Sequence, residues 1–298
     1  MKRCNLTMIL ADKWKDYKVL ETGQSNKLES WGDVVLLRPD PQVIWNNPIK
    51  KKHLADAVYK RSSKGGGSWD YRKDLPESWV IKYRDLSFNV RPTGFKHTGL
   101  FPEQAANWDF IMDNIKNAGR EIKVLNLFAY TGGATVAAAS AGASVVHVDA
   151  AKGMVAWAKD NIKLSGLEDK PVRYIVDDVV KFVQREQRRG NKYDCIIMDP
   201  PSYGRGPKGE IWKLENELYG LVEECVKVLS DKPLFFIINS YTTGLAPSVL
   251  SNILRITTEN KFEIESIVAD ELGLPVENSS TVLPCGSTAR CIFRQDKK

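Results

Sequence analysis

The chain has 298 residues, of which 43% are hydrophobic and 27% are charged, as in an ordinary globular protein of one large or two moderate domains. It contains no apolar run near the roughly 20 residues that a membrane-spanning helix needs, and its first residues lack the pattern of a cleaved signal peptide. Its five cysteines form no CxxC pair and its three histidines are dispersed, so we expect neither a metal site nor a disulfide framework. We expect a cytoplasmic protein without membrane contact, while the oligomeric state stays open.

Positive charge is concentrated in the first third of the chain. The net charge is +6, yet residues 1–100 hold 19 Lys and Arg against 11 Asp and Glu, while the remainder holds 24 against 26. This excess favours an anionic macromolecule such as RNA as a partner. A solvated basic surface without a partner is the alternative.

Residues 1–95 are expected to form a small β-rich module that contacts the substrate or RNA. They show no long helical periodicity, and turn signals separate short apolar runs. The expected strands are 34–37, 42–45, 79–83 and 86–90, with a short helix at 50–59.

Residues 96–298 are expected to form a second, α/β domain. After a helix over 103–118, apolar strands and amphipathic helices alternate, which predicts a doubly wound parallel sheet. Two further strand-like runs near the end can close the sheet with an antiparallel hairpin. The expected strands are 122–128, 144–148, 172–176, 193–198, 233–238, 262–269 and 288–294, and the expected helices are 133–141, 151–165, 178–189, 213–229 and 247–258.

A glycine turn follows the first strand of this domain. The strand over 122–128 runs into Ala129-Tyr130-Thr131-Gly132-Gly133 and then into a helix. Glycine lets a ligand approach the backbone, and a helix N-terminus favours a negative group. The dinucleotide pattern GxGxxG is absent, so the turn favours a nucleoside whose charged end is an amino acid.

Acidic residues end the next three strands. Asp149 can accept hydrogen bonds from both hydroxyls of a ribose. Asp177 or Asp178 can meet an adenine amino group, and Asp178, at the expected helix start, is preferred, although either can be only a helix N-cap. Asp199 follows the fourth strand. Together these residues predict a nucleoside-cofactor site.

The run from Asp199 to Tyr203 reads Asp-Pro-Pro-Ser-Tyr and directly follows a buried strand. It brings a carboxylate, free carbonyls and an aromatic ring to the edge where open α/β sheets bind ligands. Asp and Pro are also ordinary turn residues. The neighbouring strand ends favour the functional interpretation, in which Asp199, Pro200 and Tyr203 are catalytic and face the acceptor.

These motifs resemble class I S-adenosylmethionine-dependent methyltransferases, and more closely the bacterial 23S ribosomal RNA large-subunit enzymes that modify cytosine C5 or guanine N7. The resemblance rests on 125–133, 148–150, 177–178 and 199–203, and on 97–104, which is similar to the segment before the core in that group. It implies a Rossmann-like seven-stranded sheet with an antiparallel last strand, and a lid formed by Phe101 and Gln104. The expected cofactor-binding residues are Phe101, Gln104, Phe128, Ala129, Tyr130, Thr131, Gly132, Gly133, Asp149, Ala150, Asp178, Val179 and Asp199.

The acceptor chemistry is expected to be N-methylation. Methylation of cytosine C5 normally needs a cysteine nucleophile, which relatives carry after the fifth strand, whereas 238–244 holds none and position 202 is serine. Cys285 in the last loop is the alternative nucleophile. Direct attack by a base nitrogen needs only orientation by Asp199 and Pro200 and stacking on Tyr203.

The sequence therefore predicts a methyltransferase of RNA, most simply ribosomal RNA. The alternatives are the same fold acting on a small molecule or a protein side chain, and a binding module without catalysis. Arg205 and Lys208, in the glycine-rich loop that ends at Trp212, can contact phosphates or can be solvated.

Overall fold

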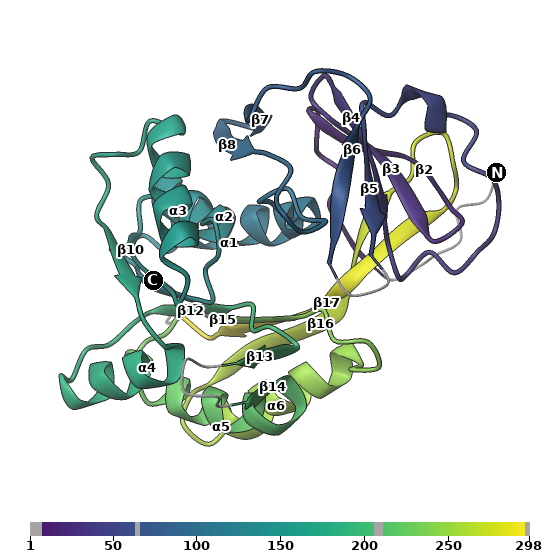
Figure 1. The fold of residues 1–298 in the computed structure, drawn as a ribbon. Helices are drawn as coiled ribbons and strands as arrows, with labels where there is room; N and C mark the ends of the chain where they lie inside the picture. The colour runs from purple at the N-terminus through teal and green to yellow at the C-terminus, as the bar shows by residue number, and fades with distance from the viewer. Residues whose placement is uncertain (1–7, 63–65, 206–210, 296–298) are drawn as a thin grey trace. The chain divides into compact units, whose positions relative to one another are not determined.

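The computed structural model describes residues 8–62, 66–205 and 211–295, and Figure 1 shows its elements along the chain. The contacts between its residues group the chain into two compact units. The first unit comprises residues 1–106 and 272–285, and the second comprises 107–271 and 286–298. This division into compact units differs from the boundary expected at residue 95.

The segment after residue 95 is bonded to the first unit. The Arg38 guanidinium donates from Nη1 to the Lys96 carbonyl at 2.8 Å, and the Trp14 indole N–H donates to the Pro102 carbonyl at 2.8 Å. These bonds join residues far apart in the sequence, so composition and periodicity along the chain do not reveal them.

A mostly parallel sheet organises the second unit. Its strands follow the order β16-β17-β15-β12-β9-β10-β11. The neighbours β15, β12, β9, β10 and β11 pair in parallel in that order, and β17 pairs antiparallel with β15. The strand bounds are β9 Lys123–Leu127, β10 Ser144–Asp149, β11 Val172–Val176, β12 Cys195–Met198, β15 Phe235–Ser240, β16 Ile264–Pro275 and β17 Val282–Phe293.

Helices cover both faces of this sheet. In Figure 1, α1, α2 and α3 lie on one face and α4, α5 and α6 on the other. The bounds are α1 Ala105–Asn117, α2 Gly133–Ser140, α3 Lys152–Leu164, α4 Val179–Arg188, α5 Leu214–Val226 and α6 Pro247–Thr258. This is the expected doubly wound α/β architecture.

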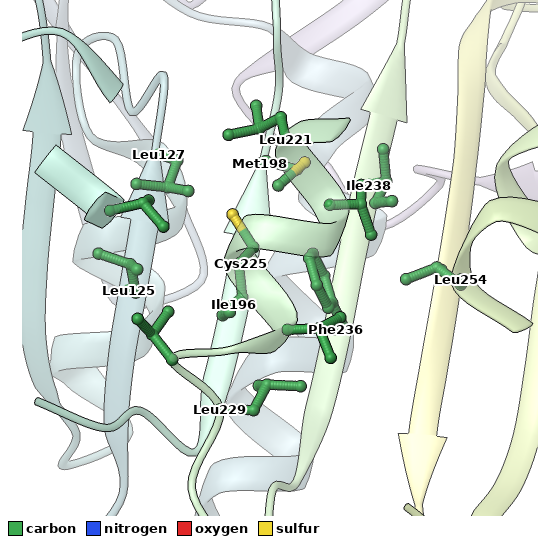
Figure 2. Packing of buried hydrophobic residues seen from close by; sticks show 14 of the residues in the cluster. Leu125, Leu127, Ile196, Met198, Leu221, Cys225, Leu229, Phe236, Ile238 and Leu254 are labelled. Carbon is green, nitrogen blue, oxygen red and sulfur yellow. The ribbon is translucent and has the colours of Figure 1, made fainter. Parts of the chain in front are cut away.

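The core of the second unit lies between the strands and α5 (Figure 2). Leu125 and Met198 from the strands pack with Leu221 and Cys225 of α5, and all four are at most 3% exposed. The i, i+4 spacing of the two helix residues places them on one face. Burying each such side chain contributes about 1.5–3 kcal/mol, so this packing positions the strand ends that carry the polar residues.

Two details of the strand pairing differ from the expectation. The two-residue strand β1 (Ile9–Leu10) pairs with Leu272 and Gly273 of β16, so the sheet of the described residues has eight strands, where seven were expected. The loop after Asp199 contains a short hairpin, β13 (Tyr203–Arg205) and β14 (Ile211–Lys213). Both pairings involve strands too short to give a periodic pattern.

The first unit is β-rich, as expected. A sheet of β2 to β6 runs in chain order, and β7 pairs with β8 in a separate hairpin. All pairs of these two sheets are antiparallel except β4 with β5. The bounds are β2 Tyr17–Gly23, β3 Asn26–Trp31, β4 Val34–Pro39, β5 Ala57–Arg61, β6 Gly67–Tyr71, β7 Trp79–Tyr83 and β8 Leu86–Val90.

Two expected elements of the first unit were wrong. The run 42–45 is not a strand, because the Asp40 carboxylate accepts a hydrogen bond from the Gln42 N–H at 3.0 Å and closes a turn. The expected helix over 50–59 is only a 3₁₀ turn, η1 (Lys52–Leu54), before β5 begins. Pairing of β5 with β4 and β6 outweighs the local helical pattern.

A buried ionic cluster lies inside the first unit. Glu29 is fully buried and accepts hydrogen bonds from Arg38 Nε at 2.7 Å and from the Tyr17 hydroxyl at 2.5 Å. Burial alone would raise the pKa of Glu29, but the Arg38 and Lys27 charges and these bonds outweigh it and lower the pKa to about 2. The carboxylate is therefore ionised and fully engaged.

Glu29→Gln is expected to lower the free energy of unfolding by about 3–5 kcal/mol, because it leaves the buried Arg38 charge without its carboxylate. The folded pKa lies below the ordinary 4.5, so the wild type loses this contribution as the pH falls from about 4.5 towards 2. Urea unfolding at several pH values measures both effects. Asp70→Asn, which breaks the exposed Lys60–Asp70 pair, is the control and should change stability little. Equal urea midpoints for Glu29→Gln and the wild type would contradict the assignment.

Candidate functional site

A left-handed turn joins β9 to α2. Phe128, Tyr130 and Gly132 have φ angles of 53°, 50° and 83°, in a region that residues other than glycine rarely adopt. Backbone hydrogen bonds hold the turn: the Ala129 N–H donates to the Val148 carbonyl at 3.0 Å, and the Gly132 N–H donates to the Ala129 carbonyl at 2.9 Å. Strained residues that their surroundings hold in place are typical of ligand-binding segments.

Two side chains from neighbouring elements fix this turn. Asp149, at the end of β10, accepts hydrogen bonds from the N–H groups of Tyr130 and Ala151, each at 2.8 Å. The buried Asn161 of α3 donates from Nδ2 to the Thr131 carbonyl at 2.8 Å. Each Asp149 oxygen has a second lone pair that can accept a further bond, so the carboxylate is positioned in advance for a ligand hydroxyl.

Packing constrains both glycines of the turn. A Cβ on Gly132 would lie 2.9 Å from the Ala158 Cβ, and a Cβ on Gly133 would lie 2.7 Å from Cζ2 of Trp108. These glycines were expected to allow a tight turn and the close approach of a ligand. The structure adds a further reason, because any side chain there would force α2 away from α3 and from the Trp108 ring.

A buried polar row that the sequence analysis did not identify lies below the turn. Asn126 Nδ2 donates to the Thr135 hydroxyl at 2.9 Å, and this oxygen lies 2.9 Å from Nδ1 of His147. All three side chains are at most 3% exposed, and burial lowers the pKa of His147 to about 4. The ring is therefore neutral at physiological pH. An asparagine and a histidine inside apolar strands were the available signal.

The acids after β11 have different partners. Asp177 pairs with Arg185 of α4. Asp178 is the N-cap of α4, where its Oδ1 accepts from the Lys181 N–H at 2.9 Å. The N-cap alternative thus holds for Asp178, which is also exposed, while Val179 is buried in the first turn of α4. Contact of Asp178 and Val179 with an adenine stays a prediction.

The segment after β12 leaves the sheet beside β9. The Asp199 N–H donates to the Leu127 carbonyl at 3.4 Å, and the Asp199 side chain is partly buried. Pro200 is buried, whereas Tyr203 is 49% exposed at the start of β13. A carboxylate and an accessible ring therefore follow β12 in close succession.

The β13–β14 hairpin fixes the second proline. The Trp212 indole N–H donates to the Pro201 carbonyl at 2.6 Å, and the Trp212 ring centroid lies 5.7 Å from that of Phe128 in the left-handed turn. On the other side, the Thr242 hydroxyl donates to that of Ser202 at 2.7 Å. Trp212 thus contacts both the turn after β9 and the segment after β12.

The parallel register brings most expected site residues to one edge of the sheet. Because β12, β9, β10 and β11 are neighbours, the turn of 128–133, Asp149, Asp178 and Asp199 all follow carboxyl ends at that edge. Ala150 is exposed there. Phe101 and Gln104 belong to the first unit, where the Phe101 ring lies 5.5 Å from that of His97; their role as a lid stays a prediction.

Some expectations fall outside what the structure describes. Residues 206–210, with Lys208, lie outside the described residues. In the part of the chain that is described, no group of three or more His, Cys, Asp or Glu side chains is arranged to hold a metal ion. None of the helices described there is long and apolar enough to cross a membrane.

Gly132→Ala is expected to destabilise the chain more than Gly142→Ala. Both positions have a positive φ, which costs an alanine about 1–2 kcal/mol, but nothing lies within 4 Å of a Cβ at Gly142. The clash with Ala158 adds about 1–3 kcal/mol at Gly132. Thermal melting measures the difference, and Ala158→Gly should recover part of the loss in the Gly132→Ala background. Equal melting temperatures for the two single variants would contradict this account.

Comparison with known proteins agrees with this geometry. Residues 27–222 match a family model described as S-adenosylmethionine-dependent methyltransferase. The crystal structure of the S-adenosylmethionine-dependent methyltransferase from Agrobacterium tumefaciens has 34% sequence identity and a TM-score of 0.89, with 97% of this chain and 94% of that chain covered.

Two curated relatives are named as ribosomal RNA enzymes. The large subunit methyltransferase K/L of Shewanella baltica is 29% identical over 233 residues, which cover 74% of this chain and 31% of the relative. The large subunit methyltransferase K of Neisseria meningitidis is 29% identical over 196 residues, 64% of this chain and 54% of the relative. The chain therefore spans only part of the length of these relatives. On the strength of the family model and the Agrobacterium structure, the chain belongs to the S-adenosylmethionine-dependent methyltransferase family.

Proposed function

We propose that this chain transfers a methyl group from S-adenosylmethionine directly to a nitrogen of an RNA base, in ribosomal RNA. The observation that carries the proposal is the segment from Asp199 to Tyr203, which leaves β12 beside the left-handed turn after β9. The names of the two curated relatives support RNA as the acceptor.

The strand ends provide the groups that a nucleoside with an amino-acid end requires. Asp149, held by two backbone N–H groups, would accept from the ribose hydroxyls. Val176, half exposed at the end of β11, offers apolar surface to an adenine beside Asp178 and Val179. The turn of 128–133 would hold the methionine portion, with Phe101 and Gln104 as its lid. The bound cofactor supplies an electrophilic methyl group on a sulfonium.

The segment after β12 would orient the acceptor. The Asp199 carboxylate and the Pro200 carbonyl accept hydrogen bonds from a base amino group and thereby direct the attacking lone pair. The half-exposed Tyr203 ring stacks on the base. Methyl transfer from a sulfonium is an in-line displacement, so the protein contributes mainly position and orientation.

The thiols of the chain support nitrogen over carbon as the acceptor. Strand β15 ends with Asn239 and Ser240, and the buried Asn239 accepts a hydrogen bond from Asn107 Nδ2 at 2.9 Å. Cys285 belongs to the first unit, and burial together with the Glu103 carboxylate raises the pKa of its thiol well above the usual value. A covalent route through cytosine C5 needs a thiolate, which this environment disfavours.

Asp199→Ala is expected to abolish methyl transfer while cofactor affinity stays within about tenfold, because the carboxylate acts on the acceptor. The assay uses radiolabelled S-adenosylmethionine and ribosomal RNA from a strain that lacks this protein, and it identifies the labelled nucleoside. Calorimetry measures cofactor affinity. Asp169→Ala, at an exposed carboxylate, is the control and should be fully active.

Two outcomes would overturn the proposal. Full activity of Asp199→Ala would contradict the role of the carboxylate. Label that enters only small metabolites or proteins, with none in RNA, would favour the same fold acting on another substrate.

Cys285→Ala is expected to keep wild-type transfer, because direct attack by nitrogen needs no thiol. The measurement is the same labelling assay, with the melting temperature as a check on folding. Loss of transfer in a folded Cys285→Ala protein, together with 5-methylcytosine as the product, would restore the covalent route.

A further inference from the structure

Resting on the proposed RNA substrate, we propose that the first unit carries its own RNA contact, in which Phe95 stacks on an unpaired base while Arg61 and Lys96 meet the adjacent phosphates. Phe95 is 67% exposed in the loop between β8 and the segment that ends at Gln104. An exposed phenylalanine ring stays in contact with water until a partner covers it.

The loop presents Phe95 in a fixed conformation. The Thr93 N–H and hydroxyl both donate to the His97 carbonyl, at 3.1 and 2.8 Å. The Phe95 N–H donates back to the Thr93 hydroxyl at 3.3 Å. The Trp69 indole N–H of β6 donates to the Thr93 carbonyl at 2.8 Å. Because these bonds order the loop before any ligand arrives, binding costs less conformational entropy.

Cations gather at the base of this loop. The Lys96 carbonyl accepts from Arg38, while the charge of Arg38 is engaged by Glu29 and that of Lys27 by Asp40, at 2.7 and 3.2 Å. Burial lowers the pKa of Lys96; the Asp40 carboxylate opposes this shift, while the neighbouring cations, including Arg61, lower the pKa further. An anion placed here therefore gains from Lys96 and Arg61, because the inner carboxylates already have partners.

The register of β5 and β6 places the remaining parts on one face. Tyr59 pairs with Trp69, and Arg61 pairs with Gly67. Because side chains alternate along a strand, Arg61 shares the face of Trp69, the residue that holds the loop. Lys60 lies on the opposite face and is paired there with Asp70. This face is buried at Ala57 and Tyr59, but Arg61 is exposed at its end and lies on the side of the Phe95 loop.

This combination favours single-stranded RNA over a protein as the partner. A ring stacks on any base, and cations beside it track the backbone. The excess of 19 Lys and Arg over 11 Asp and Glu in residues 1–100 extends the same charge over the module. An apolar protein surface would meet these cations at a desolvation cost.

The test measures binding of the full chain to a fluorescein-labelled, unstructured 12-nucleotide RNA at several salt concentrations. Phe95→Ala should weaken binding by about 5–150-fold, the range measured for loss of one stacked base, while Phe95→Trp keeps the affinity. Arg61→Gln should reduce the slope of log affinity against log salt by about 0.7. Tyr219→Ala, at a 43% exposed ring on α5, is the matched control and should bind as the wild type. Calorimetry with S-adenosylmethionine should show unchanged cofactor affinity for every variant.

The outcomes separate this inference from the proposed function. If the wild type methylates RNA but Phe95→Ala binds RNA as tightly as the wild type, the Phe95 contact is wrong and the proposed function stands. If the wild type neither binds nor methylates RNA, both fail. If Phe95→Ala weakens binding to another protein and leaves RNA binding unchanged, the loop contacts a protein partner and the RNA contact is wrong.

Discussion

The turn after β9 holds Phe128, Tyr130 and Gly132 in left-handed conformations, and the neighbouring elements keep it there. Asp149 ties it to β10, and Asn161 ties it to α3. Left-handed aromatic residues are costly in isolation, so this turn exists only while β9, β10 and α3 are in register. The strand ends that carry the proposed cofactor-binding residues depend on the same strand register.

The fold of the second unit could be predicted because its signals are local. Apolar strands and amphipathic helices alternate, and each element is long enough to show its own period. The first unit was harder, since the Asp40 carboxylate closes a local turn that interrupts a strand-like apolar run, and the pairing of β5 with β4 joins residues distant in the sequence. Pairs of two or three residues, as in β1 and β13, carry no period at all.

The site was predictable to a similar extent. Glycines and acids at strand ends were visible, because parallel strands bring their carboxyl ends together. The hydrogen-bond partners that hold these residues in place were not visible in the sequence. In the sequence Trp212 only marked the end of a glycine-rich loop, yet its indole N–H donates to the Pro201 carbonyl. His147 was set aside as isolated, yet it belongs to the polar row with Thr135 below the turn. Such partners converge only after folding.

The long strands β16 and β17 belong to both units, since residues 272–285 count with the first and their flanks with the second. The Val276 backbone bridges to Val19, and Leu272 pairs with Ile9. The ribosome synthesises these partners about 260 residues apart, so the first unit stays incomplete until almost the whole second unit has been synthesised. Contacts this distant in sequence slow folding, and the basic module becomes complete only after residues 272–285 have been synthesised.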